Sequence, residues 1–393
     1  MKRAVWVIAG ICFFLSLWTV LPGPNLFFLR FAVVVPEVSP VLSGAIAMAL
    51  LFILVKLTRH GLRRNRGASR WLIGLLLGSL FLCSLPLLQQ PGAVAKAERS
   101  MDRAFGMEDT TGEQVFVPTF SWLTMLTGFS RQRVRIARNV AYETSEGVSL
   151  SLNLYQPLLP GQYPAVVTIY GGSWARGTPA ESDTIGRFLA ARGYVVAALD
   201  YRHAPDYRFP VQLEDVMAGL TFVREQAEAF EIERDRLALL GWSAGAHLAM
   251  LAGFQDKDLV RSIVNYYGPV DLFNGYYDIP QPDPIDVREV LKAFIGGTPD
   301  EFPEAYIAAS PLTYVKTASP ASLPATLLIY GGRDHLVESR FGRKLYEALV
   351  GGKHVAVWVE IPWAEHAFDK VFNGVSNQMA LHFIERFLAQ TLK

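Results

Sequence analysis

Ser243 lies in the pattern Gly241-Trp242-Ser243-Ala244-Gly245, in which a serine hydroxyl could attack a carbonyl carbon. An apolar run with strand character, Leu237–Leu240, precedes the pattern and a helical segment follows it. So tight a turn from strand to helix strains the backbone at the serine, and only small residues fit at the two glycines. The hydroxyl would then lie at a helix N-terminus, where the dipole favours developing negative charge. We predict that Ser243 is a nucleophile.

A nucleophilic serine needs a base, and the base needs an acid that orients it. In enzymes with this serine pattern the acid and then the histidine follow along the chain. Asp334 comes just after the apolar run Leu327–Tyr330, so its carboxyl can reach an imidazole at the edge of a sheet, and we predict that it is the acid. Asp271, after the preceding strand, is the alternative acid; otherwise it caps a helix or bonds within a loop.

Four histidines follow the predicted acid. His366 lies in the loop between the last predicted strand and the last predicted helix, where an imidazole can reach the serine, and we predict that it is the base. His335 adjoins the acid and would point elsewhere, His354 enters a strand, and His382 lies in the final helix. His247, a few residues after the nucleophile, is interpreted as structural.

Backbone N–H groups from two places could bind the oxyanion that such an attack creates. One is the N–H of Ala244, directly after the nucleophile. The others are those of Gly172 and Ser173 in the loop Tyr170-Gly171-Gly172-Ser173-Trp174, where glycines let N–H groups approach a substrate. The alternative for the glycine pair is a plain tight turn.

The elements around these residues alternate between buried strands and helices from about Val140 onwards. Short β-branched runs have the length of buried strands, and longer segments with helical patterning separate them. This alternation predicts an α/β fold, a mostly parallel sheet with helices on both faces. The predicted strands are Ala165–Tyr170, Tyr194–Leu199, Leu237–Leu240, Ser262–Tyr267, Thr326–Tyr330 and Val355–Ile361, and helices are predicted at Asp183–Arg192, Leu213–Phe230 and Arg340–Val350.

Together these segments resemble the esterase and lipase branch of the α/β-hydrolases, near the feruloyl-esterase-like and hormone-sensitive-lipase-like groups. The resemblance covers about residues 140–393 and implies an α/β-hydrolase fold, a carboxylic-ester hydrolase acting through an acyl-enzyme on Ser243, and no metal or organic cofactor. It is carried by Tyr170–Trp174, Asp200-Tyr201-Arg202-His203-Ala204-Pro205, Phe209-Pro210 with Glu214-Asp215, Gly241–His247, and the segments around Asp334 and His366.

The sequence departs from the family pattern at three places. Tyr170 stands where the loop usually begins with histidine, although its hydroxyl can still hydrogen-bond and hold the loop. Ser173 replaces a third glycine or alanine. Trp242 replaces the acidic residue common before the nucleophile in the hormone-sensitive-lipase group, which favours the feruloyl-esterase-like side.

Three apolar runs precede the predicted enzyme: Ala4–Leu21, Val38–Leu57 and Trp71–Leu88. Each is close to the roughly 20 residues that span a bilayer, and in lipid they must be helical. Alternatively they are buried helices of a soluble protein, and the first could be a signal peptide. The run Leu26–Val35 is expected to be interfacial or re-entrant. We therefore predict a membrane region at 1–90, a linker or amphipathic lid at 91–138, and a catalytic domain at 139–393.

Basic residues concentrate between the second and third apolar runs, and this connection has no acidic residue. Because Lys and Arg are retained on the cytoplasmic side, the N-terminus and this connection are expected inside, and the hydrolase on the extracytoplasmic side. The connection carries Lys56, Arg59, Arg63, Arg64, Arg66 and Arg70.

The segment between the two predicted parts carries large apolar residues within Phe116–Phe129. They predict either an amphipathic lid or bilayer-resting surface, or a helix packed on the hydrolase. The basic residues that follow fit a solvated edge strand or contact with lipid headgroups; they are Arg131, Arg133, Arg135 and Arg138.

Composition excludes several classes of function. A net charge of +1 gives no global field for nucleic acid. Cys12 and Cys83 are the only cysteines, which excludes a disulfide framework and a thiolate metal cluster. The expected partners are a small-molecule or lipid ester and the membrane, while the oligomeric state stays open. Two other functions remain: an amidase or peptidase on the same triad, and a non-catalytic membrane receptor.

Overall fold

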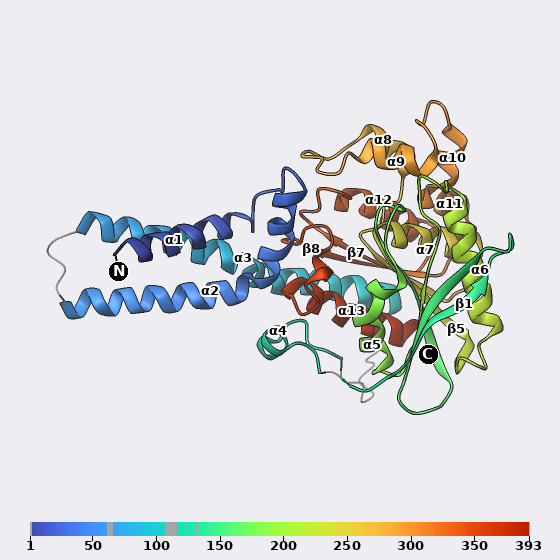
Figure 1. Ribbon diagram of the computed structural model, residues 1–393, viewed down its shortest axis with the longest axis horizontal. Helices are drawn as coiled ribbons and strands as arrows, with labels where there is room; N and C mark the ends of the chain where they lie inside the picture. Colours follow the sequence, from blue (N-terminus) through green and yellow to red (C-terminus); the bar gives the residue numbers. More distant parts are fainter. Residues whose placement is uncertain (1, 61–65, 107–115, 131, 393) are drawn as a thin grey trace.

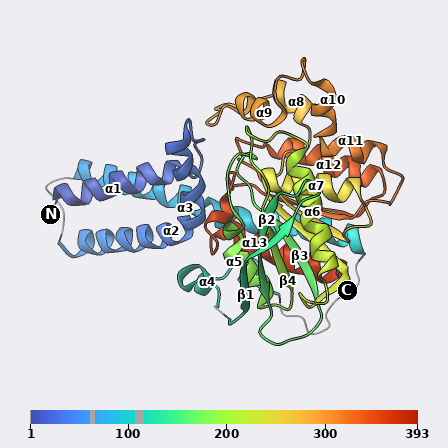
Figure 2. The ribbon, with the colours of Figure 1, turned by 45° about the vertical axis from the view of Figure 1, so that its right-hand side comes forward.

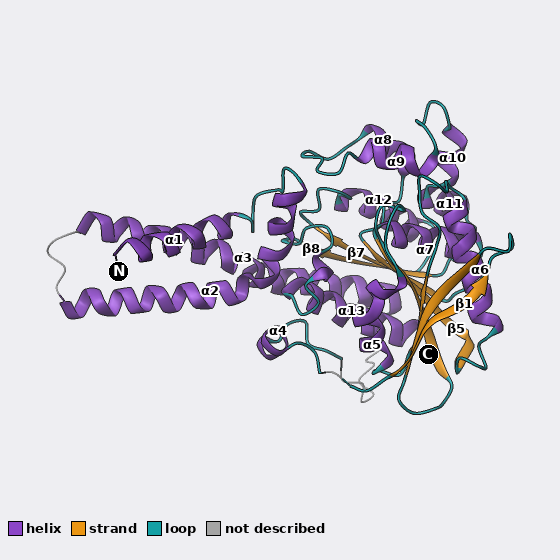
Figure 3. Ribbon diagram, viewed as in Figure 1, coloured by secondary structure: helices purple, strands orange, loops and turns teal. Residues whose placement is uncertain are grey.

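The computed structural model describes residues 2–60, 66–106, 116–130 and 132–392 of the 393-residue chain. Figure 1 shows a bundle of long helices that projects from a larger body. In Figure 3 the strands lie within the body, and the projecting bundle is helical. The apolar N-terminal runs and the predicted α/β segments of the sequence therefore form two separate parts of the molecule, the bundle and the body.

One eight-stranded sheet forms the centre of the body, in the order β1-β2-β4-β3-β5-β6-β7-β8. The strand pairs β1–β2 and β2–β4 are antiparallel, and every pair from β4 to β8 is parallel. The strands are β1 (Arg135–Glu143), β2 (Ser149–Gln156), β3 (Tyr163–Ile169), β4 (Val195–Leu199), β5 (Ile232–Trp242), β6 (Ser262–Tyr266), β7 (Ala325–Gly331) and β8 (Ala356–Ile361).

Helices cover both faces of this sheet, as the sequence predicts. Strands buried on both faces need continuous apolar runs, and β4 and β6 are buried along their whole length. Helices α6, α7 and α12 cover one face, and α5 and α13 cover the other (Figures 1 and 2). The helices of the body are α5 (Asp183–Ala190), α6 (Val211–Glu225), α7 (Ala244–Gln255), α8 (Leu272–Tyr277), α9 (Val287–Ile295), α10 (Pro303–Ala308), α11 (Pro311–Thr317), α12 (Ser339–Gly351) and α13 (Val375–Thr391), with short 3-10 turns η1 (Pro179–Ser182) and η2 (Phe368–Lys370).

The projecting bundle consists of α1 (Lys2–Leu17), α2 (Leu26–His60) and α3 (Arg66–Phe105). Two of its helices are long and apolar enough to cross a membrane, over Leu26–Val55 and Arg70–Phe105, whereas the apolar part of α1, Trp6–Leu17, is shorter. The structure thus gives two candidate spans where the sequence predicts three. The side chains of Lys56, Arg59, Arg63, Arg64 and Arg66, on which the predicted orientation depends, lie outside the described residues.

The first turns of α2 run across the end of the bundle, and its remainder runs along the bundle (Figures 1 and 2). Pro36 and Pro40 lie inside the helix between these parts. Proline removes a backbone hydrogen bond and clashes with the preceding turn, which explains the change of direction. Leu26–Val35, predicted to be interfacial or re-entrant, is continuous with the rest of α2 and lies within its candidate span.

Helix α3 continues from the bundle into the body without a break. Ala93, Ala97 and Met101 are buried in the core of the body, and the Ser100 hydroxyl accepts a 2.8 Å hydrogen bond from the backbone N–H of Trp358 in β8. This helix therefore covers the edge strand of the sheet, which would otherwise expose unpaired backbone groups. The predicted boundary at residue 90 falls inside α3, because one helix serves both parts.

The segment between α3 and the sheet contains the short helix α4 (Trp122–Thr127). Met125 is buried against the body, while Trp122, Leu123 and Leu126 are exposed. Helix α4 thus combines features of both expected interpretations, a packed helix and an apolar surface.

The basic residues after α4 lie on or beside an edge of the sheet. Arg135 and Arg138 belong to β1 and form ion pairs with Glu231 and Asp183, which fits the edge-strand interpretation. Arg131 lies outside the described residues.

Candidate active site

Ser243 lies on a sharp turn between β5 and α7 with φ +51° and ψ −119°. This is a strained conformation for a residue with a side chain. A Cβ at Gly241 would lie 2.4 Å from the carbonyl oxygen of Gly245, and a Cβ at Gly245 would lie 2.1 Å from that of Ile169. Both glycines are therefore required by close backbone contact, as the sequence pattern predicts.

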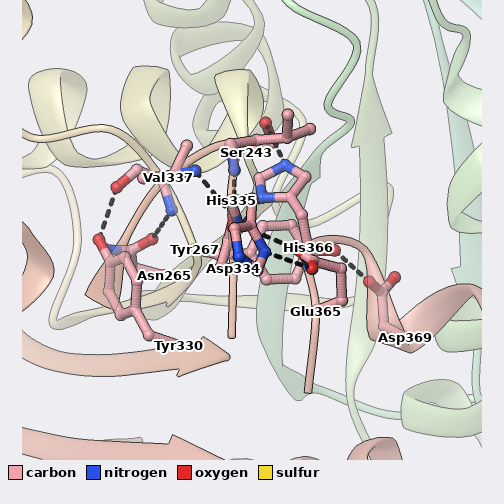
Figure 4. A network of polar contacts seen from close by, with 12 residues as sticks. Ser243, Asn265, Tyr267, Tyr330, Asp334, His335, Val337, Glu365, His366 and Asp369 are labelled. Carbon is pink, nitrogen blue, oxygen red and sulfur yellow. Dashed lines mark hydrogen bonds and ion pairs between the residues drawn. The ribbon is translucent and has the colours of Figure 1, made fainter. Parts of the chain in front are cut away.

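The side chains of Ser243, His366 and Asp334 lie in line at the carboxyl ends of β5, β8 and β7 (Figure 4). The Nε2 atom of His366 is 3.0 Å from Oγ of Ser243, and its Nδ1 atom is 2.7 Å from Oδ2 of Asp334. His366 and Asp334 are both buried. The structure thus brings together three residues separated by up to 123 positions in the chain.

The carboxylate of Asp334 is fixed from its other side. Its Oδ1 atom accepts hydrogen bonds of 2.8 Å from the backbone N–H groups of Leu336 and Val337. These two bonds leave Oδ2 directed at the imidazole, which then carries its proton on Nδ1 and presents Nε2 to the serine.

Two opposing effects set the pKa of His366. Burial lowers the pKa, but the charge of Asp334 and its hydrogen bond raise it, so that the net shift is upward from the ordinary value of 6.5. The nearby carboxyl groups of Glu365 and Asp369 act in the same upward direction. The imidazole is therefore a stronger base than one in water, which favours proton transfer from a hydroxyl.

Further groups that sequence reasoning missed surround the imidazole (Figure 4). The ring of Tyr267 lies 4.5 Å from that of His366 between centroids, and the Tyr267 hydroxyl donates a hydrogen bond to the half-buried Asp369. Glu365 accepts a 3.1 Å hydrogen bond from the N–H of His366 and pairs with Nδ1 of His335 at 2.7 Å. Glu365 could have been inferred from the sequence, because it is an acidic residue directly before the predicted base His366. No sequence pattern near Tyr267 indicates that it belongs to the site.

The loop after β3 contains Gly172 and Ser173, two of the three predicted oxyanion donors. Gly172, Ser173 and Trp174 have φ values of +127°, +56° and +58°, and a Cβ at Gly171 would lie 2.6 Å from the carbonyl oxygen of Trp242. This conformation brings the loop backbone against the nucleophile turn. Ala244 begins α7, where N–H groups have no partner within the helix. Gly172, Ser173 and Ala244 all line the cavity at Ser243.

Tyr170 holds this loop in place of the family's usual histidine. Its hydroxyl donates a 2.5 Å hydrogen bond to Oδ1 of Asp200, and its ring stacks on Tyr201 with 4.5 Å between centroids. The neighbouring Arg202 forms a two-pronged, buried ion pair with Asp215. The motif residues that carried the family resemblance thus form one scaffold under the loop.

His247 is structural, in agreement with its interpretation from the sequence. It is buried; its Nδ1 accepts a 3.2 Å hydrogen bond from the indole N–H of Trp174, and its Nε2 donates to the carbonyl oxygen of Ala309 at 2.6 Å. Burial lowers the pKa of His247 to about 4, so the ring stays neutral and keeps this tautomer. It therefore fixes Trp174 and, through it, the loop.

The remaining candidates do not join the serine. Asp271 caps α8, where its carboxylate accepts a 3.1 Å bond from the N–H of Asn274, although it also lines the cavity. His335 is paired with Glu365, His354 accepts a bond from the N–H of Leu323, and His382 donates to the carbonyl of Val117. Each of these alternatives thus has hydrogen-bond partners other than Ser243.

A cavity of about 430 Å³ opens at Ser243 and His366. This volume is within the range of small-molecule binding sites. Its wall away from the triad is mostly aliphatic, and it includes two residues of the bundle, Leu26 and Leu29. The other aliphatic lining residues include Val270, Leu272, Ile285, Val287, Val290, Leu291, Leu336 and Val337.

Comparison with known protein families fits this geometry. A family model described as BD-FAE matches residues 152–349, just over half of the chain. The chain belongs to the BD-FAE family. The match covers the sheet from β2 to β7 with the helices between them, and it includes the loop at Gly172, Ser243 and Asp334.

Curated relatives of this BD-FAE chain are named as esterases. Esterase LipC of Mycobacterium tuberculosis is 30% identical over 243 residues, 58% of each chain. Isoprenylcysteine alpha-carbonyl methylesterase ICME of Arabidopsis thaliana is 29% identical over 257 residues, 61% of this chain and 58% of that one. The chain thus spans less than two thirds of the length of these relatives.

Solved structures share the fold at lower identity. A bacterial heroin esterase superposes with a TM-score of 0.58 and 22% identity, covering 69% of this chain and 88% of that one. The carboxylesterase EstE1, cloned from a metagenomic library, gives a TM-score of 0.57 and 22% identity, covering 78% and 98%. The body of the molecule therefore has the α/β-hydrolase fold.

Proposed function

We propose that this chain is a membrane-anchored serine hydrolase of carboxylic esters that acts through Ser243, His366 and Asp334. The observation that carries the proposal is the unbroken path of hydrogen-bond contacts of 3.0 and 2.7 Å from the Ser243 hydroxyl through the imidazole to a buried carboxylate. Membership of the BD-FAE family and the esterase names of the relatives support the same reaction.

In the first half of the reaction, Oγ of Ser243 attacks the ester carbonyl carbon while its proton passes to Nε2 of His366. Asp334 keeps the other ring nitrogen protonated and stabilises the imidazolium that forms. The negative oxygen of the tetrahedral intermediate accepts hydrogen bonds from backbone N–H groups. Collapse of the intermediate breaks the bond to the alcohol, which leaves with the proton from His366.

The second half removes the acyl group. Water gives a proton to Nε2 of His366 and attacks the acyl carbon, and the second tetrahedral intermediate releases the acid while the proton returns to Ser243. The N–H groups of Ala244, Gly172 and Ser173 are the proposed donors to the oxyanion in both halves. Each such donor is worth roughly 3 kcal/mol in the transition state.

The test is covalent labelling of the full chain with a fluorophosphonate, together with hydrolysis of 4-nitrophenyl acetate. We expect the label on Ser243 and hydrolysis that is lost in Ser243→Ala. Thr313→Ala is a matched control, because Thr313 lies in α11 outside the cavity lining. Folded protein that neither labels nor hydrolyses esters would instead favour a non-catalytic receptor.

An amidase or peptidase on the same triad is the second enzymatic candidate, since the triad serves both reactions. Matched 4-nitrophenyl acetate and 4-nitroacetanilide distinguish the two. We expect a far higher kcat/KM for the ester, and the reverse order would replace esterase by amidase. The names of the relatives include both a methylesterase of isoprenylcysteine and an arylesterase. Similarity alone therefore does not identify which ester is the substrate.

We further propose three membrane spans, with the N-terminus inside and the hydrolase on the extracytoplasmic side. The basic residues of the connection between the second and third runs and the apolar content of α2 and α3 support this topology. In a bacterial host, a C-terminal alkaline phosphatase fusion should be active and a C-terminal green fluorescent protein fusion dark. The opposite pair of results would place the hydrolase in the cytoplasm.

A further inference from the structure

The cavity at Ser243 has a wall that does not come from the hydrolase body. Leu26 and Leu29, one turn apart at the start of α2, line it together with body residues such as Val290 and Val337. Leu29 is only 8% exposed, whereas Leu26 is 50% exposed. One leucine is thus packed, and the other presents an open apolar side chain at the cavity.

This part of α2 is attached to the body by polar contacts next to the triad. The carboxyl group of Glu37 is fully buried and accepts hydrogen bonds from the N–H and hydroxyl of Ser376 at 2.8 and 2.5 Å. The guanidinium of Arg333, adjacent to Asp334, donates to the carbonyl oxygen of Thr19. Because Glu37 and Ser376 are fully buried and hydrogen-bonded to each other, the start of α2 has a fixed position relative to Ser243.

The location of the bilayer follows from the bundle. Its side chains beyond the body include exposed large apolar groups, among them Met48, Leu51, Phe52, Trp71 and Phe81, which in water would form an unusually large apolar surface. Lipid is the solvent that removes this cost.

The transverse start of α2 lies where this bundle meets the body (Figures 1 and 2). Helix α4, with exposed Leu123 and Leu126, lies on the side of the body from which the bundle projects (Figure 1). The cavity wall formed by Leu26 and Leu29 is therefore at the boundary between bilayer and hydrolase.

We propose that the cavity at Ser243 takes the apolar chain of an ester dissolved in the bilayer, and that Leu26 and Leu29 form the membrane-side wall along which this chain enters. The inference rests on the proposed function and names its substrate class. A chain of methylene groups gains about 0.8 kcal/mol per buried CH₂ when it leaves water, but an ester already in lipid gains little. A continuous apolar path therefore lets the substrate chain move from the bilayer to Ser243 without passing through water.

A purely structural role for the two leucines is the alternative. A leucine that only fills an interface is covered on all sides, which describes Leu29 but not Leu26. Under that alternative, changing Leu26 would leave the preference for chain length unaltered. Chain-length preference is therefore the property to measure.

The experiment uses the full chain in vesicles of phosphatidylcholine and phosphatidylglycerol. The substrates are 4-nitrophenyl dodecanoate and dodecyl acetate, which carry the long chain on either side of the ester, compared with 4-nitrophenyl acetate. Fluorophosphonate labelling counts the active sites in each sample. We expect Leu26→Asp to lower the ratio of long-chain to short-chain kcat/KM about tenfold or more, since a pocket changed by one or two apolar groups loses at least this much discrimination.

Two further variants separate the cavity wall from general effects. Phe27→Asp places the same charge on the neighbouring residue, which is 61% exposed and outside the cavity lining, and should leave the ratio within about twofold of wild type. Leu26→Trp should shift the preferred chain to a shorter length, a change that partial unfolding does not produce.

An unchanged chain-length profile in both Leu26 variants would overturn the inference, as would an equal loss in Phe27→Asp. A wild-type protein that cleaves 4-nitrophenyl acetate but neither long-chain ester in vesicles would also overturn it, while leaving the proposed function intact. Failure of the proposed function is distinct, because no ester would then be cleaved and Ser243 would not be labelled.

Discussion

The Nδ1 atom of His366 lies 2.7 Å from Oδ2 of Asp334, while the other oxygen of the same carboxylate accepts two backbone N–H groups. The carboxylate is therefore held by the turn that follows β7 as well as by the histidine. A carboxylate fixed in this way selects one tautomer of the imidazole. The orientation of the imidazole thus depends on a buried carboxylate that is itself fixed by backbone N–H groups.

Asp334→Asn should lower kcat by about 10⁴-fold, because an amide in this place favours the wrong imidazole tautomer while leaving the fold intact. Steady-state hydrolysis of 4-nitrophenyl acetate measures the effect. Asp271→Asn is the matched control, since Asp271 caps α8, and it should change kcat less than tenfold. Comparable losses in the two variants would show that the acid is wrongly assigned.

As the pH is lowered, kcat/KM should decrease with an apparent pKa above 6.5, which gives the pH profile an acidic limb. His366 accepts the serine proton only when neutral, and its pKa in the folded protein is raised above 6.5 by Asp334 despite burial. The rate should therefore be constant at higher pH and fall as the pH drops through this raised value. In Asp334→Asn, burial remains and the charge is gone, so the limb of the residual activity should move to lower pH. A limb that stays in place would assign the titration to another group.

The three catalytic candidates could be predicted because their chemistry restricts residue type, order and location. Ser243, Asp334 and His366 each follow a recognisable strand, and the carboxyl ends of parallel strands meet at one edge of the sheet. The predicted mostly parallel sheet was also confirmed, because its strands can be recognised in the sequence. Strands such as β4 are buried on both faces and have continuous apolar sequences.

Contacts set only by tertiary structure could not be predicted. Strand β2 was missed because its leucines alternate with serine and asparagine, so it has no continuous apolar run, and β1 was foreseen only as an edge. Tyr267 and Asp369 are 102 positions apart, and neither has a local pattern that marks a pair. Glu37 is a single acidic residue in an apolar region, so its sequence context suggests a membrane flank and does not indicate a partner in α13.

The glycine after the nucleophile should tolerate no side chain. A Cβ at Gly245 would lie 2.1 Å from the carbonyl oxygen of Ile169 and 2.3 Å from that of Tyr170, and both are backbone atoms that cannot move aside. We expect Gly245→Ala to destabilise the protein by about 1–3 kcal/mol and to slow fluorophosphonate labelling more than tenfold. Gly351→Ala is the control, because nothing lies within 4 Å of its added Cβ, and it should change stability by at most about 1 kcal/mol. Thermal unfolding in detergent checks both, and equal melting temperatures would contradict the packing argument.

Glu37→Ala should weaken the attachment of the bundle to the hydrolase. Ser376 lies in the first turn of α13, where its N–H has no partner within the helix, and Glu37 of α2 satisfies it. The Ser376 hydroxyl also accepts a 2.9 Å bond from the indole of Trp363, in the loop that leads to His366. Leaving the N–H buried and unpaired should cost about 1–3 kcal/mol, which lowers the melting temperature of the full chain by several degrees. Glu37→Gln, which keeps an acceptor oxygen, should lose less than half as much. A melting temperature unaffected by Glu37→Ala would mean that this contact does not hold α2 against the body.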